Sequence, residues 1–199
     1  MIYKKSCTKS IGALTHTCDP CDTPELGRVR SLILIKKGTS LNITTLNVQE
    51  WRTGIEAGTI IVIPKTIGSF DGGTPKTGDG YGDETERVLS NDYVLSIKDP
   101  NYADNVDFWE AAEGETWNVA WRSETLLHYV DKDCKLTAKA PIEEGLDSRI
   151  VWNVEIKWNS RTKPQVVPFE TIAEIFDCFE VKSSSSSASA SASASTEAQ

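Results

Sequence analysis

The stretch SRIVWNVEIKW, residues 148–158, decides the fold class of this chain. Every second position from 150 to 158 is apolar, and the positions between them carry Val151, Asn153, Glu155 and Lys157. Side chains alternate between the two faces of a strand, so this period predicts a long β-strand with one buried face.

Several other segments have the same character. Alternation recurs over residues 93–97 and 117–121, and more weakly over 136–140. Two short runs rich in β-branched residues, SLILI at 31–35 and TIIVI at 59–63, are followed closely by Gly or Pro, and residues 126–130 are a further candidate. These runs read as additional buried strands. The sequence therefore predicts a mostly β fold.

Helical signals are few. Residues 104–114, DNVDFWEAAEG, place Asp104 as a candidate N-cap, Asp107 near the positive end of the helix dipole, and Gly114 where a left-handed cap would lie. This segment predicts one short helix. A second helical segment is expected after Pro168, because residues 169–176 have apolar residues at helical spacing.

Composition divides the chain into three parts. Residues 1–26 contain three cysteines and no sustained period, which predicts an irregular arm, and residues 183–199 are a Ser/Ala run expected to be a disordered tail. Residues 27–182 are the expected β-rich assembly domain. Within this domain, residues 64–87 are rich in glycine and lack an apolar period, which predicts a long loop of the kind that usually serves binding or assembly.

The net charge and the lengths of the apolar runs exclude some classes of protein. A net charge of −8 argues against a chain that binds nucleic acid tightly, since phosphate contacts need clustered Lys and Arg. No apolar run approaches the roughly 20 residues of a membrane-spanning helix, and the start of the chain does not resemble a signal peptide. We expect a reducing cytoplasm, in which the five cysteines are thiols.

No catalytic constellation is evident. Only two histidines are available, and the GxSxG, GxxxxGK[ST] and GxGxxG motifs are absent. We therefore expect no enzyme activity and no cofactor.

The arm raises the question of a metal. The C-x-x-C knuckle is typical of structural zinc sites, but a usual module has a second, distant pair of ligands. Zinc binding, an incidental or interface role, and redox chemistry remain open, and none is assigned to the four candidate ligands, Cys7, His16, Cys18 and Cys21.

The loop acids and the tryptophans each have a functional interpretation and a purely structural one. The loop acids Asp71, Asp79, Asp83 and Glu84 could bind calcium, yet their spacing matches no calcium loop, which favours a solvated or subunit-facing loop. Cys134 and Cys178 are expected to pack in strands or the core. Tryptophans can form ligand platforms, but core packing is expected for the four on the alternating faces: Trp117, Trp121, Trp152 and Trp158.

A family resemblance emerges from the run ERVLSNDYVLSIKDPNYADNVDFWEAAEGETWNVAWRSETLLHYVDKD, residues 86–133, and its continuation through SRIVWNVEIKW to PFETIAEIF. The order of strand, DPN turn, helix and Trp-bearing strand resembles the tail tube proteins of long-tailed bacteriophages, over residues 27–180. The resemblance implies a two-sheet, sandwich- or barrel-like subunit with a helix. It also implies hexameric rings that stack around a channel for DNA.

The resemblance also assigns partners and a site. It implies a homo-oligomer that contacts other virion proteins, with DNA only as passing cargo, no membrane, assembly in the host cytoplasm and residence in the virion. The loop would reach an adjacent ring, with the subunit interface at Phe70, Asp71, Asp79, Tyr81 and Asp83. The Cys-bearing arm and the Ser/Ala tail depart from the family pattern, which leaves open which virion component this is.

Two other functions stay open at this point. The chain could be another phage structural or assembly protein, such as a tail terminator, a ring protein or a capsid decoration protein. Alternatively, it could be a non-viral β-sandwich binding module, which would need exposed tryptophans.

Overall fold

The computed structural model describes residues 27–39, 41–44, 46–64, 66–80, 86–142 and 150–176. The expected mostly β fold with one or two short helices is confirmed. In chain order the elements are β1 (Ser31–Lys36), α1 (Val48–Glu56), β2 (Ile60–Ile63), β3 (Ile67–Phe70), β4 (Thr74–Asp79), β5 (Glu86–Asp99), α2 (Val106–Glu113), β6 (Thr116–Arg122), β7 (Leu126–Lys139), β8 (Trp152–Ser160), β9 (Gln165–Pro168) and the 3₁₀ segment η1 (Glu170–Phe176). The predicted arm 1–26 and tail 183–199 lie outside the described residues.

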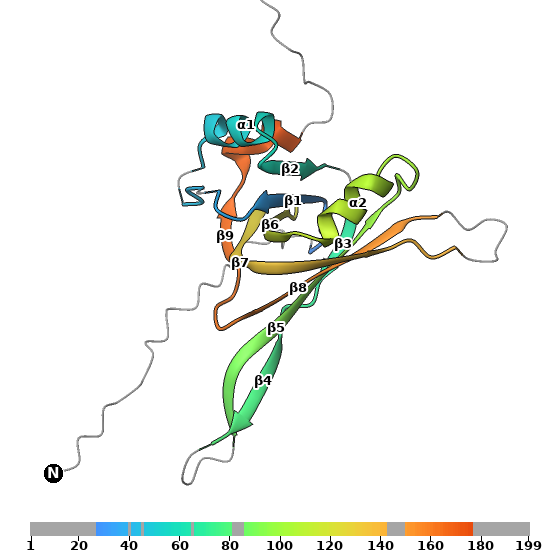
Figure 1. The fold of residues 1–199 in the computed structure, drawn as a ribbon. Helices are drawn as coiled ribbons and strands as arrows, with labels where there is room; N and C mark the ends of the chain where they lie inside the picture. The colour runs from blue at the N-terminus through green and yellow to red at the C-terminus, as the bar shows by residue number, and fades with distance from the viewer. Residues whose placement is uncertain are drawn as a thin grey trace, which may run out of the picture.

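Within the described residues, nine strands form one antiparallel sheet in the order β2-β1-β6-β7-β8-β5-β3, with β4 paired to β5 and β9 paired to β7 (Figure 1). The order does not close into a barrel. An isolated bridge between Val29 and Gly68 nevertheless brings the residue before β1 to β3. The two ends of the sheet therefore lie near each other.

The expected two sheets are joined through β7, which changes its neighbour along its length. Leu126–Tyr129 of β7 pairs with β9, whereas Lys135–Lys139 pairs with β8. A register shift on the β6 side sets residues 131–133 of β7 opposite Asn118 alone, and such a bulge bends a strand. Trp121 of β6 and Trp158 of β8 then approach to a ring-centroid distance of 5.9 Å, although their strands are not sheet neighbours. The two halves of the sheet thus pack face to face.

The inner faces of these halves form the larger core. Alternate residues of β5, β6 and β8 are buried there, as the sequence period predicted. All six tryptophans are buried, so the expectation of core packing is confirmed for the four on the alternating faces. Burying a large apolar side chain contributes about 1.5–3 kcal/mol, so these positions account for much of the stability of the fold.

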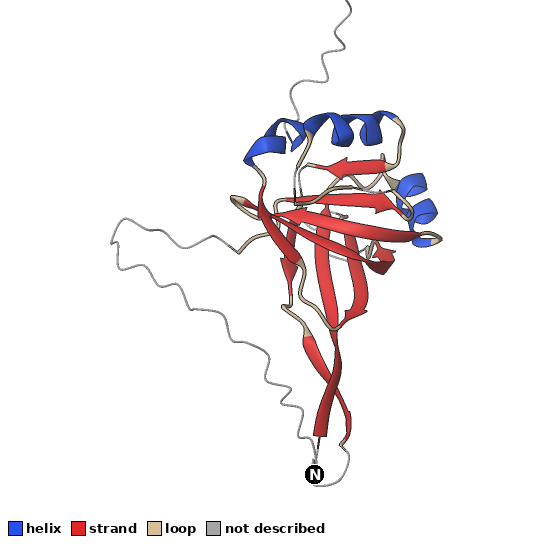
Figure 2. Cartoon of the chain, turned by 90° about the vertical axis from the view of Figure 1, so that its left-hand side faces the viewer, coloured by secondary structure: helices blue, strands red, loops and turns tan. Residues whose placement is uncertain are grey.

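The outer face of β1 and β6 carries a second core, which explains why five consecutive residues of β1 are buried. Ile33 and Ile35 lie on this face and are covered by α1 through Trp51 and by η1 through Ile172. Figure 2 shows both helical segments on this side of the sheet. The sequence period did not reveal α1, whose first turn is capped by the Asn47 side chain accepting a hydrogen bond from the Gln49 N–H.

The helix expected at residues 104–114 is present as α2, but its ends differ. The N-cap is Asn105, and Gly114 has a φ of −76°, so no left-handed cap forms. The helix is held instead by the buried Asp99, whose carboxylate accepts hydrogen bonds from Asn105 Nδ2 at 2.6 Å and from Trp109 Nε1 at 2.9 Å. The segment after Pro168 is a 3₁₀ helix.

The prediction of a long loop over residues 64–87 was wrong. Residues 67–70 and 74–79 form β3 and β4, and both pair with β5. These strands lack an apolar period because much of their surface faces solvent, so alternation could not reveal them.

Candidate assembly surface

The β4–β5 hairpin extends beyond the body of the sheet, at the end opposite α1 (Figures 1 and 2). β8 pairs with β5 only from Asn91 onward, so residues 86–90 have β4 as their one partner strand. On the free edge, the Leu89 carbonyl accepts a hydrogen bond from Arg161 Nε at 3.0 Å. Beyond that contact the hairpin is a two-stranded ribbon, and such a ribbon is at best marginally stable in water.

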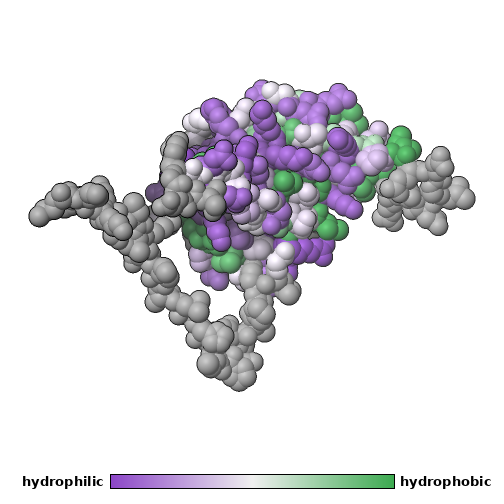
Figure 3. All heavy atoms as spheres, turned by 90° about the horizontal axis from the view of Figure 1, so that it is seen from below, coloured by the Kyte–Doolittle hydropathy of each residue, from purple (hydrophilic) through white to green (hydrophobic). Residues whose placement is uncertain are grey.

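The ribbon exposes apolar side chains. Val88 is 57% exposed and Leu89 is 43% exposed. Leu89 lies over Gly78, where a Cβ would come within 2.7 Å of Leu89 Cδ1. Figure 3, which views the molecule from the hairpin end, shows hydrophobic groups among hydrophilic ones on this face. Exposed apolar groups on a projecting element are typical of protein–protein contact sites.

The base of the hairpin is rigidly anchored. The Asp71 carboxylate accepts hydrogen bonds from the Gly73 N–H at 3.0 Å and from the Val94 N–H at 3.1 Å, which ties the β3–β4 turn to β5. Gly73 has a φ of +94° and lies against the Tyr93 ring, so the turn requires glycine there. Phe70 packs into the core, 4.9 Å from the Trp121 ring and 5.9 Å from the Trp158 ring between centroids.

These contacts locate the residues expected at the subunit interface. Phe70 and Asp71 hold the hairpin base, and Asp79 is exposed at the end of β4, directly opposite Glu86. The structure therefore brings Phe70 and Asp71 together at the base and places Asp79 at the far end of β4. Tyr81 and Asp83 lie outside the described residues. Their interface role stays a prediction.

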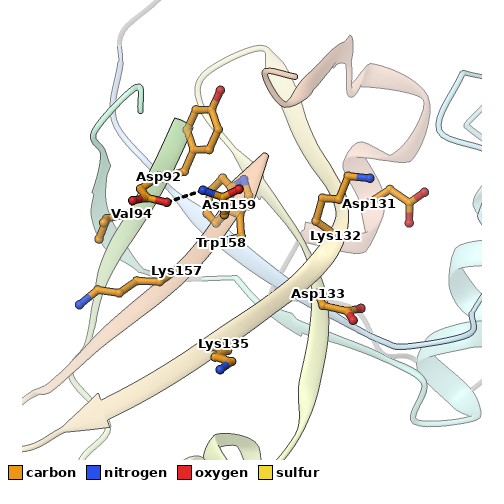
Figure 4. Close-up of a pocket in the computed structure, with 10 residues that line it drawn as sticks. Asp92, Val94, Asp131, Lys132, Asp133, Lys135, Lys157, Trp158 and Asn159 are labelled. Carbon is orange, nitrogen blue, oxygen red and sulfur yellow. Dashed lines mark hydrogen bonds between the residues drawn. The ribbon is translucent and has the colours of Figure 1, made fainter. Parts of the chain in front are cut away.

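A groove of about 780 Å³ opens where β8 diverges from β7. Its lining includes three aspartates and three lysines, together with Trp158 and Asn159. Asn159 Nδ2 donates a hydrogen bond to the Asp92 carboxylate at 2.5 Å (Figure 4). The Asp133 carboxylate lies 2.6 Å from Nζ of Lys37, a residue that does not line the groove. At least two of these charges are therefore satisfied within the chain, which weakens the groove as a ligand site.

Three titratable groups on β7 and β8 have shifted pKa values. Burial, followed by the charge of Asp133, raises the pKa of the Cys134 thiol to about 12, so this thiol is protonated and unreactive at neutral pH. Cys134 is fully buried, which confirms its expected packing role, whereas Cys178 lies outside the described residues. Burial also raises the pKa of Tyr129, and the hydrogen bond from Lys157 lowers the pKa of Glu155.

One Ser–His contact is present. Ser123 Oγ lies 3.5 Å from His128 Nε2, and 3.3 Å from the Leu126 carbonyl to which it donates. The His128 ring stacks on Trp121, with ring centroids 5.1 Å apart. A hydroxyl committed to a turn carbonyl is a poor nucleophile. These contacts indicate a role in holding the β6–β7 turn.

Across the described ranges, no group of three or more His, Cys, Asp or Glu residues is placed to hold a metal ion. Cys7, His16, Cys18, Cys21, Asp83 and Glu84 lie outside these ranges. Within the same ranges, no helix is long and apolar enough to cross a membrane.

Comparisons of the chain with protein-family models, with curated proteins and with solved structures gave no match. The functional argument therefore depends on the geometry of the chain.

Proposed function

We propose that the chain is a structural virion protein, the subunit of a phage tail tube that forms stacked, hexameric rings around a DNA-conducting channel. The observation that carries this proposal is the β4–β5 hairpin, which extends from the sheet with Val88 and Leu89 in solvent. A two-stranded ribbon with apolar groups in water is stabilised when another protein surface covers it.

The free strand edges support the same function. The hairpin leaves β5 residues 86–90 without a second partner strand, and β2 lies at one end of the sheet, whereas the bridge from Val29 to Gly68 partly covers the outer edge of β3. Unpaired strand edges are templates for pairing with another chain. In a closed ring or a stack, sister copies complete such edges.

The charge of the chain fits a channel that DNA passes through. A net charge of −8 disfavours tight phosphate contacts, so a polyanion would move past the subunit without being trapped. The proposed partners are sister copies and other virion proteins. The proposed location is the virion after assembly in the host cytoplasm, with no catalysis and no cofactor.

The test is the assembly state of the purified chain, measured by light scattering coupled to size-exclusion chromatography and by electron microscopy. Wild type is expected to form rings or tubes as its concentration rises, and Val88→Asp is expected to lose the larger assemblies. Val166→Asp is the matched control, because Val166 is 49% exposed on a different strand. A wild-type chain that stays monomeric at every concentration would contradict the proposal.

A second candidate is a β-sandwich binding module, favoured by the groove at the β7–β8 divergence, whose volume falls in the range of ligand sites. This function needs accessible aromatic platforms, whereas the tryptophans are buried. Other phage assembly parts, such as a tail terminator or decoration protein, would give single rings or capsid-bound copies without stacking.

A further inference from the structure

A second groove, of about 680 Å³, lies at the end of β5 remote from the hairpin. Its charged lining is entirely basic, with Arg28, Arg30 and Lys98, and its other lining residues are Pro64, Thr66, Ile67, Pro100 and Val151. We call this set the basic groove. In a chain with a net charge of −8, a cavity lined by cations and without acids is a distinctive feature.

The cations of the basic groove are largely uncompensated. Arg30 lies 3.0 Å from Glu124, but across the described ranges neither Arg28 nor Lys98 forms an ion pair. The Thr66 hydroxyl is buried and has no hydrogen-bond partner among the described residues. Ile67 is 57% exposed and adds an apolar contact. The groove is therefore suited to an acidic partner that also carries apolar groups.

The far end of the hairpin has the complementary character. Asp79 of β4 and Glu86 of β5 are directly opposite each other in the ladder, so both carboxylates project from the same face. Like charges in that arrangement destabilise an isolated hairpin, and a cation from outside would relieve the repulsion. Arg87 and Lys76 are also on the hairpin, but residues adjacent in a strand point to opposite faces, which directs Arg87 away from Glu86. Val88 shares the face of Glu86 and is exposed.

The hairpin end cannot reach its own groove. Glu86 and Lys98 lie near opposite ends of β5, and the twelve residue-to-residue steps between them span about 40 Å of strand. A contact between the two surfaces must therefore join different copies. Because the two surfaces differ, the contact is head-to-tail, and a head-to-tail contact that does not close into a ring repeats along a stack.

We propose that the hairpin end of one copy, with Asp79, Glu86 and Val88, docks in the basic groove of the next copy along the stack. The inference deepens the proposed function by naming the surfaces that join successive rings. It assigns the carboxylates of Asp79 and Glu86 to Arg28 and Lys98, and the exposed Val88 side chain to Ile67 and the groove prolines.

Charge reversal tests the contact. A hairpin variant, Asp79→Lys with Glu86→Lys, and a groove variant, Arg28→Glu with Lys98→Glu, are each expected to raise the concentration needed for stacking at least tenfold. A 1:1 mixture of the two variants is expected to stack, because each lysine-bearing hairpin then meets an acidic groove and each acidic hairpin meets a basic one. The chain that carries all four changes is expected to stack by itself.

A matched control is Glu56→Lys with Glu110→Lys, which changes the net charge as the hairpin variant does at exposed positions on α1 and α2. This control should stack as wild type does. If the hairpin and groove variants both stack normally, or if their mixture fails to stack, the docking inference is wrong while the proposed function stands. A wild-type chain that never assembles would instead remove both. Circular dichroism establishes that each variant is folded before it is scored.

Discussion

The β3–β4 turn offers the sharpest structural prediction, because adjacent glycines there differ in one respect. Gly72 and Gly73 have φ values of +77° and +94°, conformations that L side chains rarely adopt. A Cβ on Gly72 would meet nothing within 4 Å, whereas a Cβ on Gly73 would come within 2.2 Å of Tyr93 Cε1. Alanine at either position tests backbone strain, and alanine at Gly73 also tests packing.

The expected magnitudes follow from these two terms. Placing a Cβ in the left-handed region costs about 1–2 kcal/mol at either site. Overpacking against a buried ring adds about 1–3 kcal/mol at Gly73, because Tyr93 is only 1% exposed and has little room to move. Gly73→Ala should therefore lower the free energy of unfolding by about 1–3 kcal/mol more than Gly72→Ala does.

Equilibrium urea unfolding, followed by tryptophan fluorescence at one fixed protein concentration, measures both variants, since all six indoles are buried in the native chain. Equal losses for the two variants, or a larger loss for Gly72→Ala, would refute the argument that the Tyr93 ring closes the hairpin base.

Three further predictions concern buried groups. Asp99→Ala should lower the free energy of unfolding by about 2–5 kcal/mol in urea titrations, because it leaves the Trp109 and Asn105 donors without their acceptor; a loss under about 1 kcal/mol would contradict this. The raised pKa of Cys134 means that its contribution to stability is complete below pH 9 and is lost as the pH rises toward 12. Cys134→Ala should accordingly flatten the pH dependence of stability in that window, and an unchanged alkaline slope would count against the assignment. Acrylamide should quench native tryptophan fluorescence weakly, whereas extensive quenching would favour the binding-module function.

The sequence could reveal strands wherever one face or both faces are buried. The alternation at 93–97, 117–121 and 150–158 identified the central parts of β5, β6 and β8, since a period of two is imposed by the core. It could not reveal β3 and β4, whose side chains are mostly exposed. Nor could it reveal α1, a short helix that the second core stabilises mainly through Trp51.

The candidate assembly surface was likewise only partly predictable from the sequence. The sequence directed attention to the region of the hairpin and to its acids, but Phe70 turned out to pack in the aromatic core and Asp71 to hold a turn. The basic groove had no signal in the sequence. Its cations come from positions 28, 30 and 98, which only the pairing of β3 with β5 and the approach of the segment before β1 bring together.

The sequence by itself determined that this chain is mostly β, because burial of one strand face leaves a period of two that local composition records. The tertiary structure decided which strands continue past the sheet, which edges stay open and which distant cations meet. Those features depend on pairing between residues far apart in the chain, and such pairing leaves no periodic trace in the segments that it joins.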